Sequence, residues 1–223
     1  MANQIGSRLV FENAKSFIQS QGYDVSQAVL TQSYVRSEVA LSTGVTNYRL
    51  PIVVNDSSNG ATAFSTERRV QLQDIHVCSS IFIGLASPSS STDAAFPLLS
   101  YPSIATNQFS AAQADALNTI YNGFLTMQVN NQNILPSWDI YRHYYVPQTQ
   151  GGVGITAQTV LPIDQIDGGE NGFYPVEPNL LLNGAANIVA SIVIPAAIST
   201  VKADSRLVCI FRTILAQNVT SVR

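Results

Sequence analysis

Alternation of side-chain character at a period of two constrains the fold of this chain more than any other feature. From Val29 to Leu41, every second residue is apolar or a small hydroxyl residue, the pattern of a strand with two different faces. Turn-forming residues separate this stretch from others with strand character. These other stretches are 47–54, 68–85, 124–129, 134–135, 179–182, 188–194 and 207–216. Eight or so strands without regular helices between them exclude βαβ alternation and predict an all-β fold, an antiparallel β-sandwich of the jelly-roll type with long loops.

Local signals predict how some of these strands begin, end and pair. Ser42-Thr43-Gly44 predicts a hairpin between strands 29–41 and 47–54. The apolar positions of 68–85 change parity near Asp74, which predicts a β-bulge or bend there. Pro136 predicts the end of central pairing after the turn at 130–133. The apolar 207–216 run predicts a central strand covered on both faces, and 148–178 a long loop.

Two short helices accompany the strands. The spacing of apolar residues predicts one over 8–20, with Ser7 as N-cap and Gly22 just past its end. A second is predicted over 110–121, with Ser110 and Gln113 forming a capping box. We expect residues 1–25 to form an N-terminal arm and residues 26–223 a single sandwich domain. The arm could pack on its own domain or dock on a neighbouring subunit, and the sequence leaves both open.

Charge is scarce in this chain. Charged residues make up 11% of it, against about 25% in average globular proteins, and the net charge is −3. A surface so poor in charge indicates burial against other subunits, because interface cores are depleted in Lys, Glu and Asp. The densest basic cluster is Arg68-Arg69, too little for an electrostatic nucleic-acid footprint, so direct nucleic-acid binding is not expected.

The sequence predicts no cofactor and no metal centre. Cys78 and Cys209 lie in apolar runs, where buried free thiols are favoured over a disulfide, although a bond between them stays possible. No Cys/His spacing suggests zinc. The acidic loop 164–171 has a composition that could bind calcium but lacks EF-hand spacing, so a solvated loop is favoured. The polar N-terminus shows no signal peptide and no run is long enough to span a membrane, so we expect no membrane contact.

The sequence contains no recognisable catalytic motif, and we expect no enzymatic activity. No nucleophile elbow is present. His76 and Cys78 would share a strand face within the sheet body rather than in a cleft. A glycosidase-like pair of acids could be drawn from Asp139 with Glu170 or Glu177.

The stretch from Gly123 to Gly152 concentrates aromatic and amide side chains, including the sole tryptophan and His143. Large aromatic residues usually fill cores and interfaces, so we interpret this stretch as a structural hub that closes the sandwich and leads into a long inter-subunit loop. Aromatic rings and amides could instead bind a sugar. The candidate inter-subunit or ligand contacts are Trp138, Tyr141, Tyr144, Gln148 and Gln150.

The second half of the chain resembles structural proteins of bacteriophage particles. The motifs that carry the resemblance are Tyr121-Asn-Gly, Val129-Asn-Asn, Ile134-Leu-Pro, Trp138-Asp, Tyr141-Arg, Val146-Pro-Gln-Thr-Gln, Pro178-Asn-Leu and Leu215-Ala-Gln-Asn-Val-Thr. The resemblance implies a capsid or capsid-associated subunit that is made in the host cytoplasm, resides in the virion, and assembles with itself and with other virion proteins. It brings no catalytic residues. The alternative is a carbohydrate- or receptor-binding β-sandwich module, and a polymer hydrolase is a third possibility.

Overall fold

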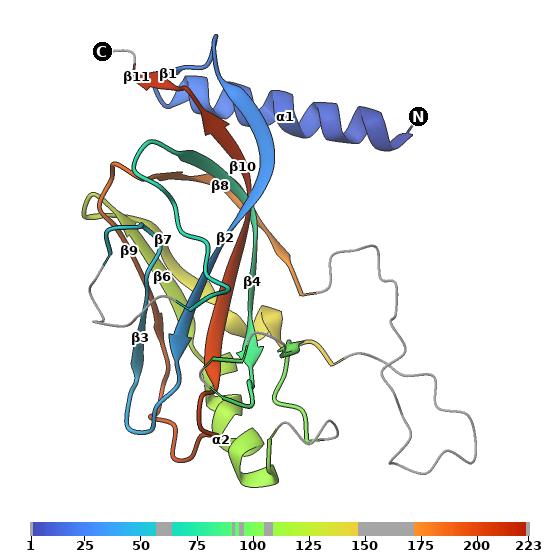
Figure 1. Ribbon diagram of the computed structural model, residues 1–223, viewed down its shortest axis with the longest axis vertical. Helices are drawn as coiled ribbons and strands as arrows, with labels where there is room; N and C mark the ends of the chain where they lie inside the picture. Colours follow the sequence, from blue (N-terminus) through green and yellow to red (C-terminus); the bar gives the residue numbers. More distant parts are fainter. Residues whose placement is uncertain are drawn as a thin grey trace.

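A computed structural model gives the arrangement of the chain. It describes residues 2–56, 64–90, 92–93, 96–104, 109–146 and 172–221, with the backbone alone for 2–9, 220 and 221. Within these ranges the protein is mostly β, with two sheets packed face to face and two helices (Figure 1).

Each sheet has four principal strands. The first sheet has the order β2 (Val29–Ala40), β10 (Arg206–Gln217), β4 (Ile75–Ala86) and β8 (Tyr174–Asn183), and the short β5 (Leu98–Leu99) also pairs with β4. The second has the order β3 (Asn47–Leu50), β9 (Ile188–Val193), β6 (Phe124–Val129) and β7 (Gln132–Asp139). A two-residue pair, β1 (Tyr23–Asp24) with β11 (Thr220–Ser221), joins the segment after α1 to the C-terminal segment.

The principal strands pair in a nested order. β2 pairs with β10, β3 with β9, β4 with β8 and β6 with β7, all antiparallel. Successive pairs alternate between the two sheets, which is the strand order of a jelly roll and confirms the predicted fold. The predicted hairpin between 29–41 and 47–54 is wrong, because the turn at Ser42-Thr43-Gly44 carries the chain from one sheet to the other.

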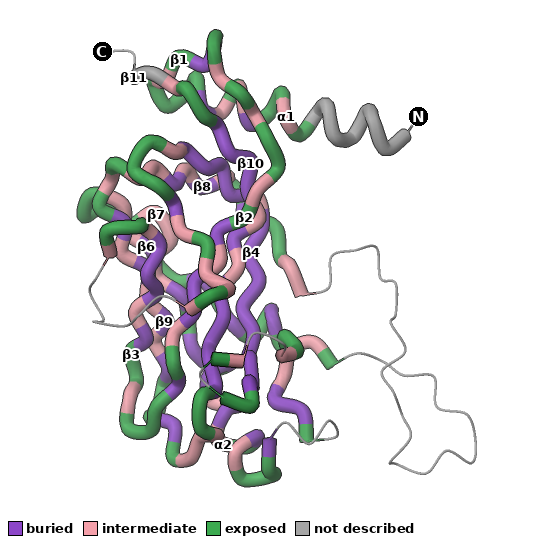
Figure 2. The backbone as a smooth tube through the Cα atoms, viewed as in Figure 1, coloured by how far each residue is buried: buried purple, intermediate pink, exposed green. Residues whose placement is uncertain are grey.

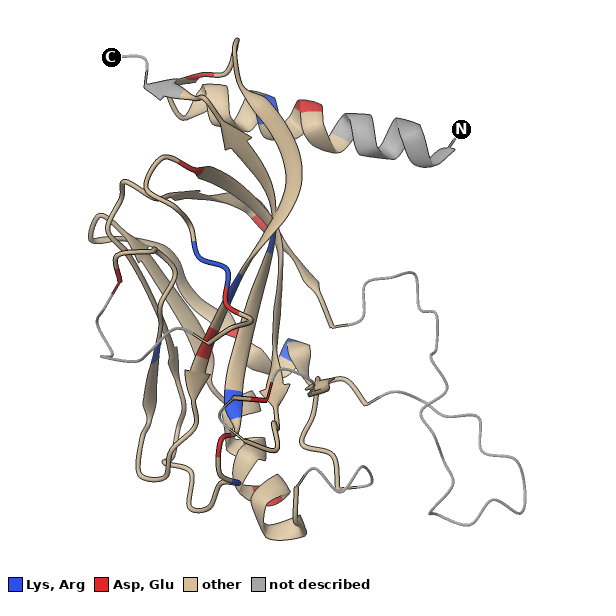
Figure 3. Cartoon of the chain, viewed as in Figure 1, with Lys and Arg blue, Asp and Glu red and all other residues tan. Residues whose placement is uncertain are grey.

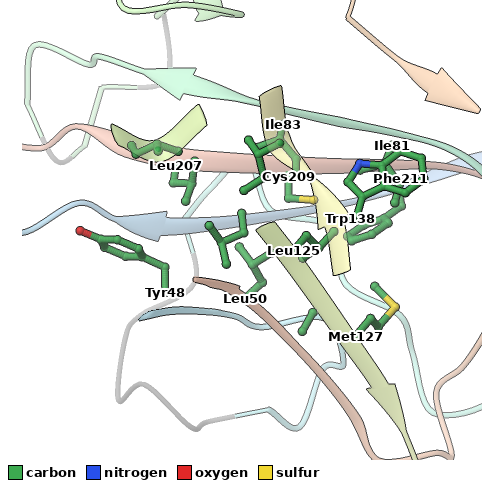
Figure 4. Close-up of a cluster of buried hydrophobic side chains, with 14 of the residues drawn as sticks. Tyr48, Leu50, Ile81, Ile83, Leu125, Met127, Trp138, Leu207, Cys209 and Phe211 are labelled. Carbon is green, nitrogen blue, oxygen red and sulfur yellow. The ribbon is translucent and has the colours of Figure 1, made fainter. Parts of the chain in front are cut away.

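β10 is the central strand of the first sheet, as the sequence predicts. It lies between β2 and β4, and its residues are buried along most of their length (Figure 2). Leu207, Cys209 and Phe211 face the second sheet and pack in the main core. Figure 4 shows these side chains together with Leu125 and Met127 from β6. Burial of both faces explains why this strand lacks simple alternation.

The long strand predicted at 68–85 is shorter than expected. Pairing begins at Ile75, and residues 71–74 form a turn, so the parity change near Asp74 marks the start of a strand rather than a bulge within one. The register irregularity lies further along, between Cys78 and Ser80 opposite β8 and at Arg212/Thr213 in β10.

The hairpin of β6 and β7 forms as expected but does not end at Pro136. Asn130 and Asn131 both have positive φ, 50° and 64°, as a tight two-residue hairpin turn requires. β7 continues through Pro136 to Asp139 because it is an edge strand, and its register shifts around the proline. A proline costs little at such a position, since no ladder hydrogen bond is lost.

The helices differ in how well the sequence predicts them. α2 (Ala111–Tyr121) has the expected Ser110–Gln113 capping box and buries Leu117 and Ile120 at one end of the sandwich. α1 (Ala2–Ser20) begins earlier than predicted, so Ser7 is not its N-cap. Gly22 follows its end with φ +84°, a conformation that glycine adopts readily.

α1 packs through a second, smaller hydrophobic cluster. Ala14 and Ile18 are buried against Ile75, Val77 and Ile214, on the face of the first sheet that points away from the main core. Figure 1 shows α1 lying across one end of the molecule, where β2 and β10 extend beyond the sandwich. The described half of the arm therefore packs on its own domain, and whether the arm also docks on a neighbour stays a prediction.

The predicted loop at 148–178 is too long at its C-terminal end. β8 begins at Tyr174. The sequence predicts a loop there because Pro175 and Pro178 are uncommon in strands. Both prolines lie where β8 is the outer strand beside β4, a position that tolerates a missing donor.

Candidate functional site

Trp138, the first candidate residue, lies at the end of β7 and faces inward. It is 8% exposed and belongs to the main core, where Figure 4 shows it among residues that include Ile81 and Phe211. The guanidinium of Arg142 lies over its ring at 4.9 Å. With one face covered by Arg142 and the rest in the core, Trp138 offers no platform for an external ligand.

A buried hydrogen-bonded chain connects Trp138 to the start of β8. Its indole Nε1–H donates to Nε2 of His143 over 2.9 Å, and the other ring nitrogen, Nδ1, lies 3.0 Å from the carbonyl oxygen of Gly172. Because Nε2 accepts, Nδ1 carries the proton and donates to Gly172. His143 is fully buried, and this desolvation lowers its pKa to about 4. The neutral imidazole thus links η1 (Ile140–His143) to the turn that precedes β8, with neither nitrogen free for general base chemistry.

Tyr141 and Tyr144 lie on the outside of the same turn. Tyr141 is 64% exposed, and its ring is parallel to that of Tyr144 within 2° at a centroid distance of 6.2 Å. Tyr144 also packs edge-on against the buried Tyr121 and against Tyr101. Tyr141 and Tyr144 therefore form a small exposed aromatic surface supported by the buried ring of Tyr121 and the half-buried ring of Tyr101.

The two candidate aromatic residues should respond differently to mutation. We expect Trp138→Phe to lower the free energy of unfolding by about 2 kcal/mol, because the buried Nε2 of His143 loses its donor. Tyr141→Ala should change it by less than about 0.5 kcal/mol, because the side chain is largely exposed. Urea denaturation followed by far-UV circular dichroism measures both, and equal losses would contradict these assignments.

Of the remaining predicted contacts and acidic residues, the structure places only Asp139 and Glu177. Gln148, Gln150 and the possible calcium loop 164–171 lie outside the described residues, as does Glu170. The carboxylate of Asp139 caps η1 by accepting the N–H of Tyr141 over 3.1 Å. Glu177 is exposed on β8, in the other sheet, and no described interaction joins it to Asp139.

The cysteines and His76 are buried in the first sheet, as the sequence suggests. Cys78 and Cys209 are both free. They lie on neighbouring strands but out of register, since Cys78 opposes Thr213 and Cys209 opposes Ile83. Burial raises the pKa of Cys78 to about 12 and that of Cys209 well above its usual value, so neither is a reactive thiolate. Nδ1 of His76 lies 2.9 Å from the hydroxyl of Thr213, and burial lowers its pKa to about 4.

A buried ionic cluster on the outer face of the first sheet is the feature that sequence reasoning missed. The carboxylate of Glu38 on β2 has no exposed area and pairs with Arg36 at 2.7 Å and with Arg206 on β10 at 3.1 Å. The hydroxyl of Thr66 donates to the same carboxylate. Three donors therefore converge on one desolvated acid, which is how buried charges are usually accommodated.

The segment 64–70 covers this cluster. The Arg206 guanidinium lies over the Phe64 ring at 4.0 Å and over Phe96 at 5.2 Å. Glu67 accepts the backbone N–H of Glu38 over 3.1 Å and pairs with Arg69 at 2.8 Å. In Figure 3, basic and acidic positions are coloured on β2, on β10 and in the segment beside them.

A hollow of about 290 Å³ lies beside the cluster, between the edge strands of the two sheets. Its wall includes Glu38, Tyr48, Arg49, Phe64, Glu67 and Arg69. Its volume is near the lower limit for small-molecule sites. The sequence does contain one sign of this ionic cluster. Arg36 and Glu38 are two opposite charges on the same face of a predicted strand, in a chain with few charges. The partner Arg206 is too distant along the chain to be identified by spacing.

Comparisons with protein-family models, with curated proteins and with solved structures found no match for this chain. Among the described residues, no helix is both long and apolar enough to cross a membrane. The same ranges contain no group of three or more His, Cys, Asp and Glu side chains placed to hold a metal ion.

Proposed function

We propose that this chain is a non-enzymatic structural subunit of a virus particle, a capsid or capsid-associated protein that assembles with copies of itself and with other virion proteins. The jelly roll is one of the folds that viral capsid proteins use, but lectins and cupins share it, so the fold supports the proposal only by analogy.

The observation that carries the proposal is the outer face of the second sheet. Its four strands carry only two charged residues, Arg49 and Asp139, both near the ends of their strands. α1 packs on the other sheet and α2 closes one end, so neither covers this face (Figures 1 and 3). Val189, Ser191, Val193 and Thr126 lie on it half-buried. A sheet face with few charges, which neither helix of the described part of the chain covers, is what an inter-subunit contact requires.

The ionic cluster strengthens this argument. Glu38, Glu67 and Arg206 form buried ion pairs. The surface therefore carries even fewer charges than the low charge content of the chain suggests. A free monomer normally depends on surface charge for its solubility.

The test is the assembly state of the purified full chain. Size-exclusion chromatography with light scattering, and negative-stain microscopy across a range of salt concentrations, should show defined oligomers or closed shells. A strict monomer at high concentration in every salt would overturn the proposal.

A carbohydrate- or receptor-binding module is the second candidate, and the exposed pair of Tyr141 and Tyr144 favours it. Parallel exposed rings can stack on sugar faces, whereas Trp138 is too buried to contribute. Glycan-array binding that is lost in Tyr141→Ala, with folding intact by circular dichroism, would support this function. Absence of binding to any glycan would remove it.

A further inference from the structure

The free edge of β2 offers unpaired backbone groups over part of its length. β2 is the outermost strand of the first sheet, with β10 on one side only. On its other side, Arg36 exchanges two backbone hydrogen bonds with Arg68, of 2.8 and 3.0 Å. This short pairing covers the edge at one position beside the ionic cluster.

The Arg36–Arg68 pair fixes which residues of β2 direct their backbone groups outward. Successive residues of a strand alternate between its two edges, and the register of β2 against β10 has no irregularity. Because the N–H and C=O of Arg36 point away from β10, those of Leu30, Gln32 and Tyr34 do so as well. The backbone N–H of Glu38, which donates outward to Glu67, agrees with this parity. No backbone group of Leu30, Gln32 or Tyr34 on this edge has a partner within the described part of the chain.

Apart from the guanidinium of Arg68, which lies over the Tyr34 ring at 5.7 Å at one end, this stretch lacks the devices that usually protect an edge. Residues 29–35 contain no charged residue, no proline and no bulge. The side chains of Val29 and Tyr34 are 51% and 46% exposed. By contrast, the edge strand β7 carries Pro136 and two register shifts, and the edge strand β3 is only four residues long. An unprotected edge of this kind is a template for pairing with another strand.

We propose that the β2 edge from Leu30 to Tyr34 pairs antiparallel with the same edge of a second copy of this chain. The two-fold axis passes beside Gln32, so that Gln32 lies opposite Gln32 of the partner subunit and Leu30 lies opposite the partner's Tyr34. About six backbone hydrogen bonds form, two at each of the three facing pairs. The first sheets of the two jelly rolls become one continuous sheet.

The edge is suited to a copy of itself rather than to an unrelated strand. A two-fold contact places each residue near its own equivalent, so any charge close to the axis would repel its copy. The stretch 29–35 is free of charge, and its pattern of donors and acceptors is self-complementary in the antiparallel direction. This inference specifies one contact of the self-assembly proposed above and rests on that function.

Charge substitutions at Gln32 test the contact. Gln32→Lys and Gln32→Glu each place two like charges opposite each other across the axis, so either variant alone should self-associate on the order of tenfold more weakly through this contact. An equimolar mixture of the two variants should recover the association, because Lys then faces Glu. Gln73→Lys is the matched control: it makes the same charge change on the exposed turn before β4, and it should associate as the wild type does.

Sedimentation velocity of the wild type, the variants and the mixture measures the outcome, with circular dichroism to verify folding. Weakened association in both variants with recovery in the mixture supports the pairing. If the wild type assembles and the Gln32 variants assemble equally well, this contact is wrong while the proposed function stands. If the wild type is strictly monomeric, both are overturned.

Discussion

Replacing Glu38 with alanine is expected to lower the free energy of unfolding by about 3–5 kcal/mol. The change leaves the guanidinium of Arg206, whose side chain is 3% exposed, buried without this carboxylate, and it also removes the partner of Arg36. The remaining cation–π contacts of Arg206 with Phe64 and Phe96 compensate only in part. Urea denaturation followed by circular dichroism provides the measurement.

Glu12→Ala serves as the control, because it removes the same charge from an exposed position on α1 and should change stability by less than about 0.5 kcal/mol. The double variant Glu38→Leu with Arg206→Met should be more stable than Glu38→Ala, because apolar residues can replace a buried ion pair at little cost. A Glu38→Ala protein as stable as the wild type would show that the cluster is solvated rather than desolvated.

Stability should fall steeply as the pH is lowered from about 6.5 to about 4, because both histidines are buried as neutral rings. His76 and His143 have folded-state pKa values of about 4, below the ordinary value of 6.5, and burial is the main cause for each. Over this range the unfolded chain binds protons that the folded chain excludes, so protonation favours unfolding. The contribution of each neutral histidine to the free energy of unfolding is fully present above pH 6.5. It decreases by about 3 kcal/mol per histidine as the pH falls to 4.

Urea midpoints measured at several pH values check this result, and single variants separate the two sites. His143→Gln should remove the part of the pH dependence of the unfolding free energy, between pH 6.5 and 4, that is due to His143. His76→Asn should remove the part that is due to His76. The charged neighbours, which are Asp74 and Arg68 near His76 and Asp139 and Arg142 near His143, are not substituted in these variants. A flat profile for the wild type over this range would contradict the neutral buried state of both rings.

The sequence predicts the strands of this protein better than it predicts their partners. Strand character in the sequence locates β2, β6, β9 and β10, through period-two alternation in β2 and through a continuous apolar run in β10, because both patterns are local. Pairing is not local: β2 pairs with β10 at the far end of the chain, whereas the turn at 42–44 suggests the adjacent strand. The prolines of β7 and β8 led to errors for the same reason, because their cost depends on whether the strand is at an edge.

In the candidate site, too, the sequence predicts local features but not contacts between distant residues. The aromatic stretch 123–152 is identifiable because its composition is unusual, and Trp138 proves to be a core residue, as the structural-hub interpretation expects. The His143–Gly172 bond and the Glu38–Arg206 pair join residues far apart in the chain, and no spacing rule reaches that far. The free edge of β2 likewise becomes visible only once Arg68 shows which backbone groups point outward.

The nested pairing of the strands has a consequence for the order in which the protein is made. On the ribosome, β6 and β7 can form their hairpin as soon as residue 139 emerges, whereas β2 has no partner strand until β10, residues 206–217, has been synthesised. Closing that loop means bringing together segments almost the whole chain apart, which slows folding. Meanwhile both edges of β2 are exposed in the nascent chain. Two chains growing side by side would therefore present this strand to each other before either jelly roll is complete.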